Sequence, residues 1–245
     1  MPSVEVKKKQ VKNTRELNDF SSLPAPKSKK ILYILLGINT FLIILGLFVG
    51  THEEVFGKEA SYITWVSFAQ LLSVSIISYK TFNERVKSIT KKEAIIWAII
   101  AVGFLFLSID EVARIHENMD SFFHKRIIHM KETSITDRLD DLIIGIYALF
   151  GIGILYNFRN ELKKFKRATP YLITSFLLVF LMVITELVSN RFDLLPFLIQ
   201  DKNIAMSIYD FCKIAEETLK LYAEVVMISG FYLCLQISKE LNKLK

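Results

Sequence analysis

The sequence contains few of the residues from which most soluble enzymes build an active site. Its 245 residues include two cysteines and four histidines. Cys212 and Cys234 fall on one predicted helix, where their separation of 22 residues spans about 33 Å, too far for a disulfide. The sequence has no Gly-rich phosphate loop, no internal repeat, and no Ser-His-Asp or Cys-His arrangement. These absences argue against a nucleotide-binding loop and against a hydrolase with a nucleophilic triad.

The histidines do not form the motifs that are typical of membrane metalloenzymes. The nearest pair, His124 and His129, is five residues apart in a predicted loop, and no His-x-x-x-His pair lies on a helix. A Glu-x-x-His motif, which di-iron sites use twice, does not occur. The sequence therefore argues against histidine-rich intramembrane hydrolases and against di-iron oxidases.

Long apolar segments are the main feature that the sequence does have. Hydrophobic residues make up 52% of the chain, and six segments approach the ~20 apolar residues that span a bilayer. We therefore predict an all-α fold, a polytopic integral membrane bundle of six transmembrane helices that forms one domain over residues 31–238. The predicted helices comprise residues 31–50, 61–79, 94–109, 142–158, 171–188, and a last helix that begins after Tyr209 and ends near Ile237.

Lysine and arginine concentrate in alternate segments between the apolar runs. Residues 1–30, 80–92, 159–167 and 239–245 are strongly basic, whereas the first connection, residues 51–60, is acidic. The positive-inside rule then predicts a multi-pass inner-membrane protein whose N-terminal tail, expected to be disordered, and C-terminal tail are both cytoplasmic. The net charge of +6 follows from this topology. We therefore expect the lipid bilayer, and no nucleic acid, as a partner.

Carboxylates gather at one predicted depth in the membrane. At ~1.5 Å per residue from the predicted cytoplasmic boundary, Asp110, Glu186 and Glu224 lie about 24, 22 and 20 Å into a hydrocarbon core ~30 Å thick. Charge at such a depth is costly and marks a functional site. The same region contains two bases, Arg114 and Lys220, and seven acids. These acids are Asp110, Glu111, Glu117, Glu186, Glu216, Glu217 and Glu224.

The excess of acids predicts a divalent-cation site that opens to the extracytoplasmic side. Oxygen ligands favour Mg²⁺, Ca²⁺ or Mn²⁺ over Zn²⁺ or Fe²⁺. With Glu111 or His116 as a general base, a metal-bound water could attack a lipid or another amphipathic substrate. His116 lies away from the polar face of its helix unless the helix unwinds before it. The expected metal ligands are Asp110, Glu117, Glu186, Glu216, Glu217 and Glu224.

Two other interpretations are open from the sequence. The first is a proton- or cation-coupled transporter, although the almost wholly apolar residues 94–107 and 171–184 argue against a wide channel. The second is a non-catalytic membrane subunit held by a buried salt-bridge network, in which Lys220 pairs with Glu216 and Glu224 at helical spacing. Pairing alone does not account for the excess of acids.

Overall fold

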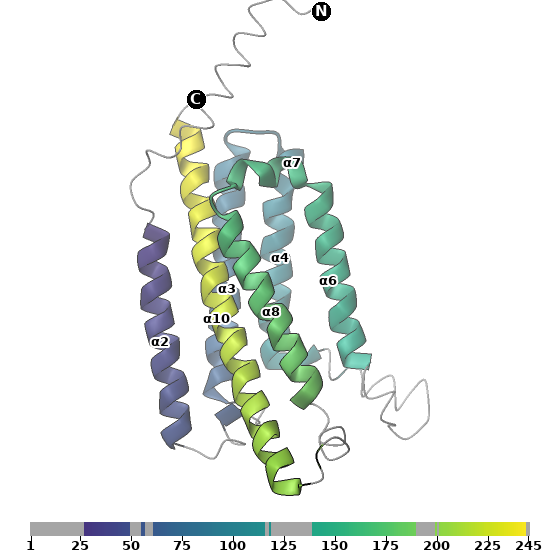
Figure 1. Ribbon diagram of the computed structural model, residues 1–245. Helices are drawn as coiled ribbons and strands as arrows, with labels where there is room; N and C mark the ends of the chain where they lie inside the picture. The colour runs from purple at the N-terminus through teal and green to yellow at the C-terminus, as the bar shows by residue number, and fades with distance from the viewer. Residues whose placement is uncertain are drawn as a thin grey trace, which may run out of the picture.

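The computed structural model is a bundle of long helices that lie side by side (Figure 1). It describes residues 27–49, 55–56, 61–115, 118, 139–189, 199 and 201–243. In these residues the regular elements are all helical, and no β-strand occurs. The all-α prediction is therefore confirmed for the part of the chain that the structure describes.

Each predicted apolar segment lies in one of the long helices. A short connection at one end of the bundle, formed by α7 (Arg159–Leu162) and the 3₁₀-helix η5 (Lys163–Phe165), joins two of them. The long helices are α2 (Lys27–Val49), α3 (Tyr62–Val86), α4 (Lys91–Ala113), α6 (Leu139–Asn157), α8 (Thr169–Ser189) and α10 (Lys202–Lys243).

The helix surfaces fit a membrane environment. Five helices, α2, α3, α4, α8 and α10, are long and apolar enough to cross a bilayer. Large side chains such as Phe41, Phe48 and Phe180 are exposed on the outside of the bundle, as suits lipid contact rather than water. The 19-residue α6 occupies the place of the fourth predicted span. The count of six spans and the orientation with both termini in the cytoplasm stay predictions.

Helix α10 is the centre of the bundle and packs against α8, α3 and α2, while α4 packs against α3. Its residues from Leu221 to Ser238 are nearly all buried, because an apolar helix surrounded by other helices presents no face to the outside. Ser175 of α8 donates a hydrogen bond to the Ala223 carbonyl at 2.9 Å. The side chain of Ser75 on α3 similarly donates to the Ala101 carbonyl of α4 at 2.7 Å. These bonds fix the register of the neighbouring helices.

The beginning of α2 and the end of α10 lie at the same end of the bundle (Figure 1). Ile31 and Leu35 of α2 pack against the core cluster that contains Cys234 and Ile237 of α10. We call this the basic end, since it also carries the lysines and arginines of α7, η5 and the α3–α4 connection. The opposite end, where α4 finishes and α10 begins, is called the acidic end.

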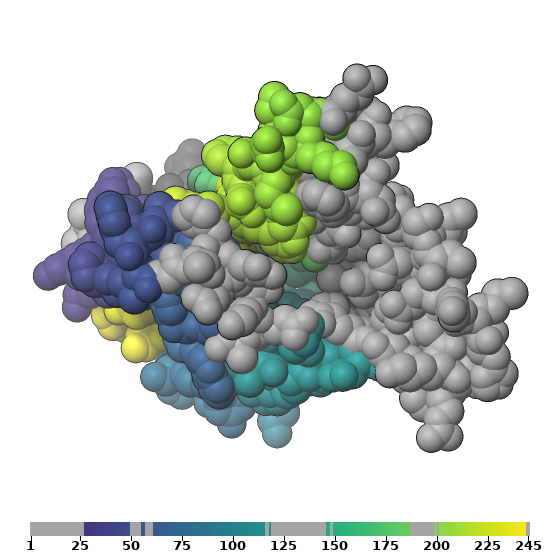
Figure 2. Space-filling model, turned by 90° about the horizontal axis from the view of Figure 1, so that it is seen from below, coloured from purple at the N-terminus to yellow at the C-terminus, as the bar shows by residue number. Residues whose placement is uncertain are grey.

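Helix α10 extends furthest beyond its predicted apolar segment. α10 begins at Lys202, before the predicted start after Tyr209, and Asp201 caps it by accepting the Asn203 N–H at 2.9 Å. Its 42 residues span about 63 Å, twice the ~30 Å hydrocarbon core. Figure 2, a view from the acidic end, shows its first turns standing out from the bundle. Hydropathy fails to mark such ends, because a helix continues in water with the same backbone hydrogen bonds.

Candidate functional site

Lys220 of α10 joins two carboxylates from different helices near the acidic end. Its Nζ donates a hydrogen bond to Glu111 Oε1 of α4 at 2.9 Å and to Glu217 Oε1, one turn earlier on α10, at 3.0 Å. The Lys220 ammonium also lies 2.7 Å from Glu217 Oε2, which is a salt-bridge distance, but this oxygen accepts no hydrogen bond from it. The three side chains are 17–20% exposed. The structure thus brings charged side chains of α4 and α10 together.

Glu224 lies one turn deeper on α10 than Lys220 and is more fully buried. It is 5% exposed, and its Oε1 accepts a hydrogen bond from Ser67 Oγ of α3 at 2.6 Å. Its Oε2 is buried and has no hydrogen-bond partner among the described residues. We call Glu111, Glu217, Lys220 and Glu224 the acid–lysine cluster. The cluster has three carboxyls and one ammonium, which bonds to Glu111 and Glu217.

A pair of amide side chains supports the cluster from α2 and α3. Asn39 Nδ2 donates to the Leu221 carbonyl of α10 at 3.0 Å, and Gln70 Nε2 donates to Asn39 Oδ1 at 2.8 Å. Both amides are buried. Because Leu221 follows Lys220 directly, this network fixes the part of α10 that carries the ammonium. Side chains from α2, α3, α4 and α10 therefore form one polar layer across the bundle.

Asp110 and Glu111 face different neighbours, although they are adjacent in the sequence. Phe106, one turn before Asp110, contacts Tyr147 of α6 with ring centroids 5.5 Å apart. Asp110 is buried on this α6-facing side of α4, whereas Glu111 reaches Lys220 on α10. The sequence placed both acids on one polar stripe; the structure divides that stripe between two helix contacts.

Two further predicted ligands, Glu216 of α10 and Glu186 of α8, lie closer to the acidic end than Glu224 does. Glu216 is 3.3 Å from Lys213 and does not pair with Lys220, as the i,i+4 spacing had suggested. Glu186 is half-buried in the last turn of α8. Since α8 runs antiparallel to α10 with Ser175 beside Ala223, Glu186 is level with residues close to Glu216. It therefore lies about three helical turns from Glu224 along the bundle axis.

Helix α4 ends before the remaining two predicted site residues. Its last residue is Ala113, and Arg114 adopts a left-handed conformation with φ 54° and ψ 48°, a conformation that costs energy for a side chain other than glycine. The condition set for His116 to reach the site, a break in the helix before it, is met at Arg114. His116 and Glu117 lie outside the described residues, so their roles stay predictions.

The described residues do not assemble the predicted metal ligands. Among them, no group of three His, Cys, Asp or Glu side chains is placed to hold a metal ion. The ammonium of Lys220 already occupies the position between Glu111 and Glu217 that a cation would take. The divalent-cation site, with its preference for Mg²⁺, Ca²⁺ or Mn²⁺, stays a prediction.

Sequence reasoning missed a second buried charge group, at the basic end. Glu161 of α7 accepts hydrogen bonds from Arg85 Nε at 2.6 Å and from Arg85 Nη2 at 3.1 Å, a bidentate pair. Lys164 lies 2.7 Å from Glu161 Oε2, and Trp97 Nε1 donates to Oε1 at 3.5 Å. The Arg85 guanidinium also lies over the Phe165 ring, 5.7 Å from its centroid. We call Arg85 and Glu161, with Lys164 beside them, the basic-end pair.

Two signals in the sequence could have found this pair. Glu161 is the only acid among the basic residues of the α6–α8 connection. Arg85 continues the buried polar face of α3, which is marked at helical spacing by Ser67, Ser78 and Thr81. Burial by itself raises the pKa of the Glu161 carboxyl, but the hydrogen bonds and positive charges of Arg85 and Lys164 outweigh burial and hold that pKa below its ordinary value.

Comparison with known proteins gives a family but no assigned activity. No curated protein and no solved structure matches the chain. A family model matches residues 29–235, which cover the bundle from the first turn of α2 to the second half of α10 and include both charge groups. The chain belongs to the family described as Domain of unknown function (DUF8692).

Proposed function

We propose that the acid–lysine cluster binds and releases a proton and that the protein is a proton-coupled membrane transporter. The observation that carries this proposal is the grouping of three carboxyls with one ammonium inside an apolar bundle: two of them bond to the ammonium, and the third, Glu224, bonds to a serine hydroxyl. Three ionised carboxylates beside a single cation are strongly unfavourable in a medium of low dielectric constant. A bound proton relieves this imbalance, and its release restores it.

The geometry favours Glu224 as the carboxyl that carries the proton. The ammonium of Lys220 contacts Glu111 and Glu217, whereas Glu224 is bonded by a neutral hydroxyl. A neutral carboxyl suits this arrangement, since its carbonyl oxygen accepts the Ser67 hydrogen bond and its other oxygen holds the proton. Burying a neutral carboxyl costs far less than burying a carboxylate without a cation.

The exposure of the cluster supports access from the acidic end. Glu111, Glu217 and Lys220 are partly exposed, and Glu224 lies one turn deeper. A proton that reaches Glu224 from the acidic end therefore passes the outer carboxylates first. Their negative charge would concentrate protons at this entrance.

Helix α3 supports a narrow route from Glu224 toward the basic end. Although α4 and α8 are apolar there, α3 carries a buried polar side chain at almost every turn beyond Ser67, from Gln70 through Ser75 to Thr81. The buried Ser78 Oγ has no hydrogen-bond partner among the described residues, as expected for a group that bonds to internal water. Hydroxyls and water pass protons without the wide pore that an ion needs.

A metal-dependent hydrolase is the second candidate function, and one observation favours it. Helix α4 ends at Ala113 with a left-handed Arg114, which is the break in the helix that a role for His116 requires. The position of Lys220 weighs against a divalent cation at the same place. An experiment that measures both ions separates the two functions.

Charge displacement on a solid-supported membrane tests the proposal without knowledge of the transported substrate. Protein reconstituted in phosphatidylcholine vesicles is exposed to rapid jumps of pH, or of Mg²⁺ or Mn²⁺ at constant pH. We expect a transient current after the pH jump in the parent protein and its loss in Glu224→Gln. Asp210→Asn removes a carboxylate from the same helix, about 21 Å from Glu224, and should leave the current unchanged.

Either of two results would overturn the assignment. A pH-jump current that is absent from the parent protein, or that persists in Glu224→Gln, would show that Glu224 binds no exchangeable proton. A current after the metal jumps instead, lost in Asp110→Asn and Glu217→Gln, would establish the divalent-cation site in its place.

A further inference from the structure

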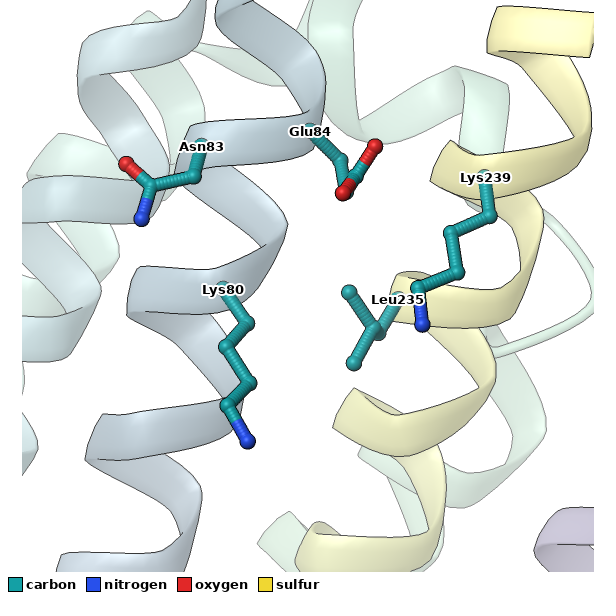
Figure 3. Close-up of a pocket in the computed structure, with 5 residues that line it drawn as sticks. All are labelled: Lys80, Asn83, Glu84, Leu235 and Lys239. Atoms are coloured by element: carbon teal, nitrogen blue, oxygen red, sulfur yellow. The ribbon is translucent and has the colours of Figure 1, made fainter.

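A groove of about 190 Å³ lies between α3 and α10 at the basic end, well away from the acid–lysine cluster. Figure 3 shows the side chains that line it. Lys80 and Lys239 extend in the same direction on opposite sides of the gap, and Leu235 lies between them. This direction follows from the parallel course of the two helices, since Cβ atoms tilt toward a helix N-terminus. The groove therefore presents two ammonium groups above an apolar floor.

The acid that lines this groove, Glu84, forms its hydrogen bonds with residues other than Lys80 and Lys239. Glu84 Oε1 accepts a hydrogen bond from Lys87 at 2.9 Å, and its Oε2 accepts one from Asn242 Nδ2 at 2.8 Å. Neither Lys80 nor Lys239 forms an ion pair with another described residue. The groove thus keeps a net positive charge that Glu84 only partly offsets, which suits an anion with more than one oxygen.

The surroundings of the groove suit a ligand with an apolar part. Ile76 lies one turn from Lys80 on the same face of α3, toward the membrane interior, and it is exposed. Tyr79 is also exposed beside Lys80, in the position of an aromatic side chain at a membrane interface. Charged oxygens between the lysines would continue into acyl chains against these side chains.

From this arrangement we infer that the groove between Lys80 and Lys239 binds the phosphate headgroup of an anionic phospholipid. Basic pockets between transmembrane helices recognise lipid phosphates in this way. The two ammonium groups bind the phosphodiester oxygens, Leu235 contacts the glycerol region, and the acyl chains lie along Ile76. The site is independent of proton binding at Glu224, because the two lie on different parts of α10.

Thermal unfolding in mixed micelles tests this inference. The parent protein is titrated with phosphatidylglycerol, with phosphatidylcholine, or with inorganic phosphate, and its melting temperature is followed. We expect a rise in melting temperature that saturates with phosphatidylglycerol alone. The rise should be lost in the double variant Lys80→Gln/Lys239→Gln. It should persist in Lys91→Gln/Lys92→Gln, which removes two exposed lysines from the same end of the bundle.

The other outcomes contradict the inference in distinguishable ways. An equal rise with inorganic phosphate would show that the ligand is a free anion and not a lipid. An equal loss of the rise in both double variants would show that general surface charge, not this groove, attracts the lipid. Should Lys80→Gln/Lys239→Gln fail to fold, native mass spectrometry of each single variant gives the same comparison through retained phosphatidylglycerol.

Discussion

The two buried charge groups of the bundle differ in how their charges balance. At the basic end, one carboxylate, Glu161, meets two cations, Arg85 and Lys164, and both of its oxygens have partners. The acid–lysine cluster has three carboxyls and a single ammonium, which pairs with Glu111 and Glu217, and one oxygen of Glu224 has no partner among the described residues. Both groups connect different helices, but Arg85 and Glu161 are more fully buried than Glu111, Glu217 and Lys220 are.

This difference separates a structural role from a functional one. An ion pair in which every charge has a partner, such as Arg85–Glu161, holds α3 to α7. It has little freedom to gain or lose a proton, because either change would leave a charge buried without a partner. The acid–lysine cluster has an excess of acid and can gain or lose a proton without breaking the Lys220 contacts. Four predictions break or sharpen this comparison, starting from the largest expected effect.

Removal of one partner from the basic-end pair should give the largest loss of stability. In Arg85→Met the Glu161 carboxylate stays buried with only Lys164 beside it, and the usual cost of such a change is about 3–5 kcal/mol of unfolding free energy. Denaturant unfolding in detergent, followed by circular dichroism, measures this cost. Lys87→Met, which removes a mostly exposed pair with Glu84, should cost less than about 1 kcal/mol. Equal costs for the two variants would contradict a structural role for the pair.

Removal of Lys220, a partly exposed cation, should cost less than removal of the buried Arg85. In Lys220→Met the partly exposed Glu111 and Glu217 can take up protons, so we expect a loss of about 1.5–3 kcal/mol that grows with pH. The double variant Lys220→Met/Glu217→Gln also removes one of the carboxylates left without the ammonium, so it should recover part of the lost unfolding free energy. A loss that is independent of pH and is not recovered in the double variant would mean that the cluster behaves like the basic-end pair.

The basic-end pair should make stability fall in acid. Because the partners of Glu161 hold its pKa below the ordinary value of 4.5, the unfolded chain binds the proton more readily than the folded one. The contribution of Glu161 is therefore complete above pH 4.5 and is lost as the pH falls through the lower folded-state pKa. The parent protein should lose unfolding free energy below pH 4.5 more steeply than Glu161→Gln does. Parallel pH profiles for the two proteins would count against the ion pair.

The smallest effect is expected from the hydroxyl that bonds to Glu224. Ser67→Ala removes one buried hydrogen bond and should cost about 0.5–1.5 kcal/mol. Ser73→Ala on the same helix removes a hydroxyl that bonds only to the Ala69 carbonyl of its own helix, and it should be close to neutral. A neutral effect of Ser67→Ala would show that the 2.6 Å contact with Glu224 does not stabilise the bundle.

The sequence was sufficient to predict the helical elements but not all of their ends. Apolar length located every long helix, because a membrane span must satisfy its backbone internally. It missed the seven residues of α3 beyond Tyr79 and the start of α10 at Lys202. The added turns of α3 are polar and the first turns of α10 mix polar with apolar residues, so hydropathy does not distinguish a helix from a loop there.

Neither depth nor helical spacing gave the contacts within the acid–lysine cluster. Counting residues along each helix put Asp110, Glu186 and Glu224 at one depth, whereas the structure places Glu186 about three turns from Glu224 and brings Glu111, not Asp110, to Lys220. Helical spacing alone suggested Glu216 as a partner of Lys220, whereas the structure pairs Lys220 with Glu217 and Glu111. The sequence could not give the orientation of neighbouring helices, which decides that Asp110 faces α6. The sequence also did not reveal the Arg85–Glu161 pair. Its members are 76 residues apart, in basic segments that were interpreted only as determinants of membrane topology.

The measurement that tests the central claim most directly is infrared spectroscopy of the carboxyl groups in membrane-embedded protein. At neutral pH the parent protein should show the absorption of a protonated carboxyl. This absorption should disappear in Glu224→Gln and persist in Glu161→Gln, since Glu161 is held as a carboxylate by its two cations. Glu224→Gln should also unfold no more easily than the parent, because glutamine resembles a neutral carboxyl in size and shape. The absence of any protonated carboxyl from the parent at neutral pH would contradict the account.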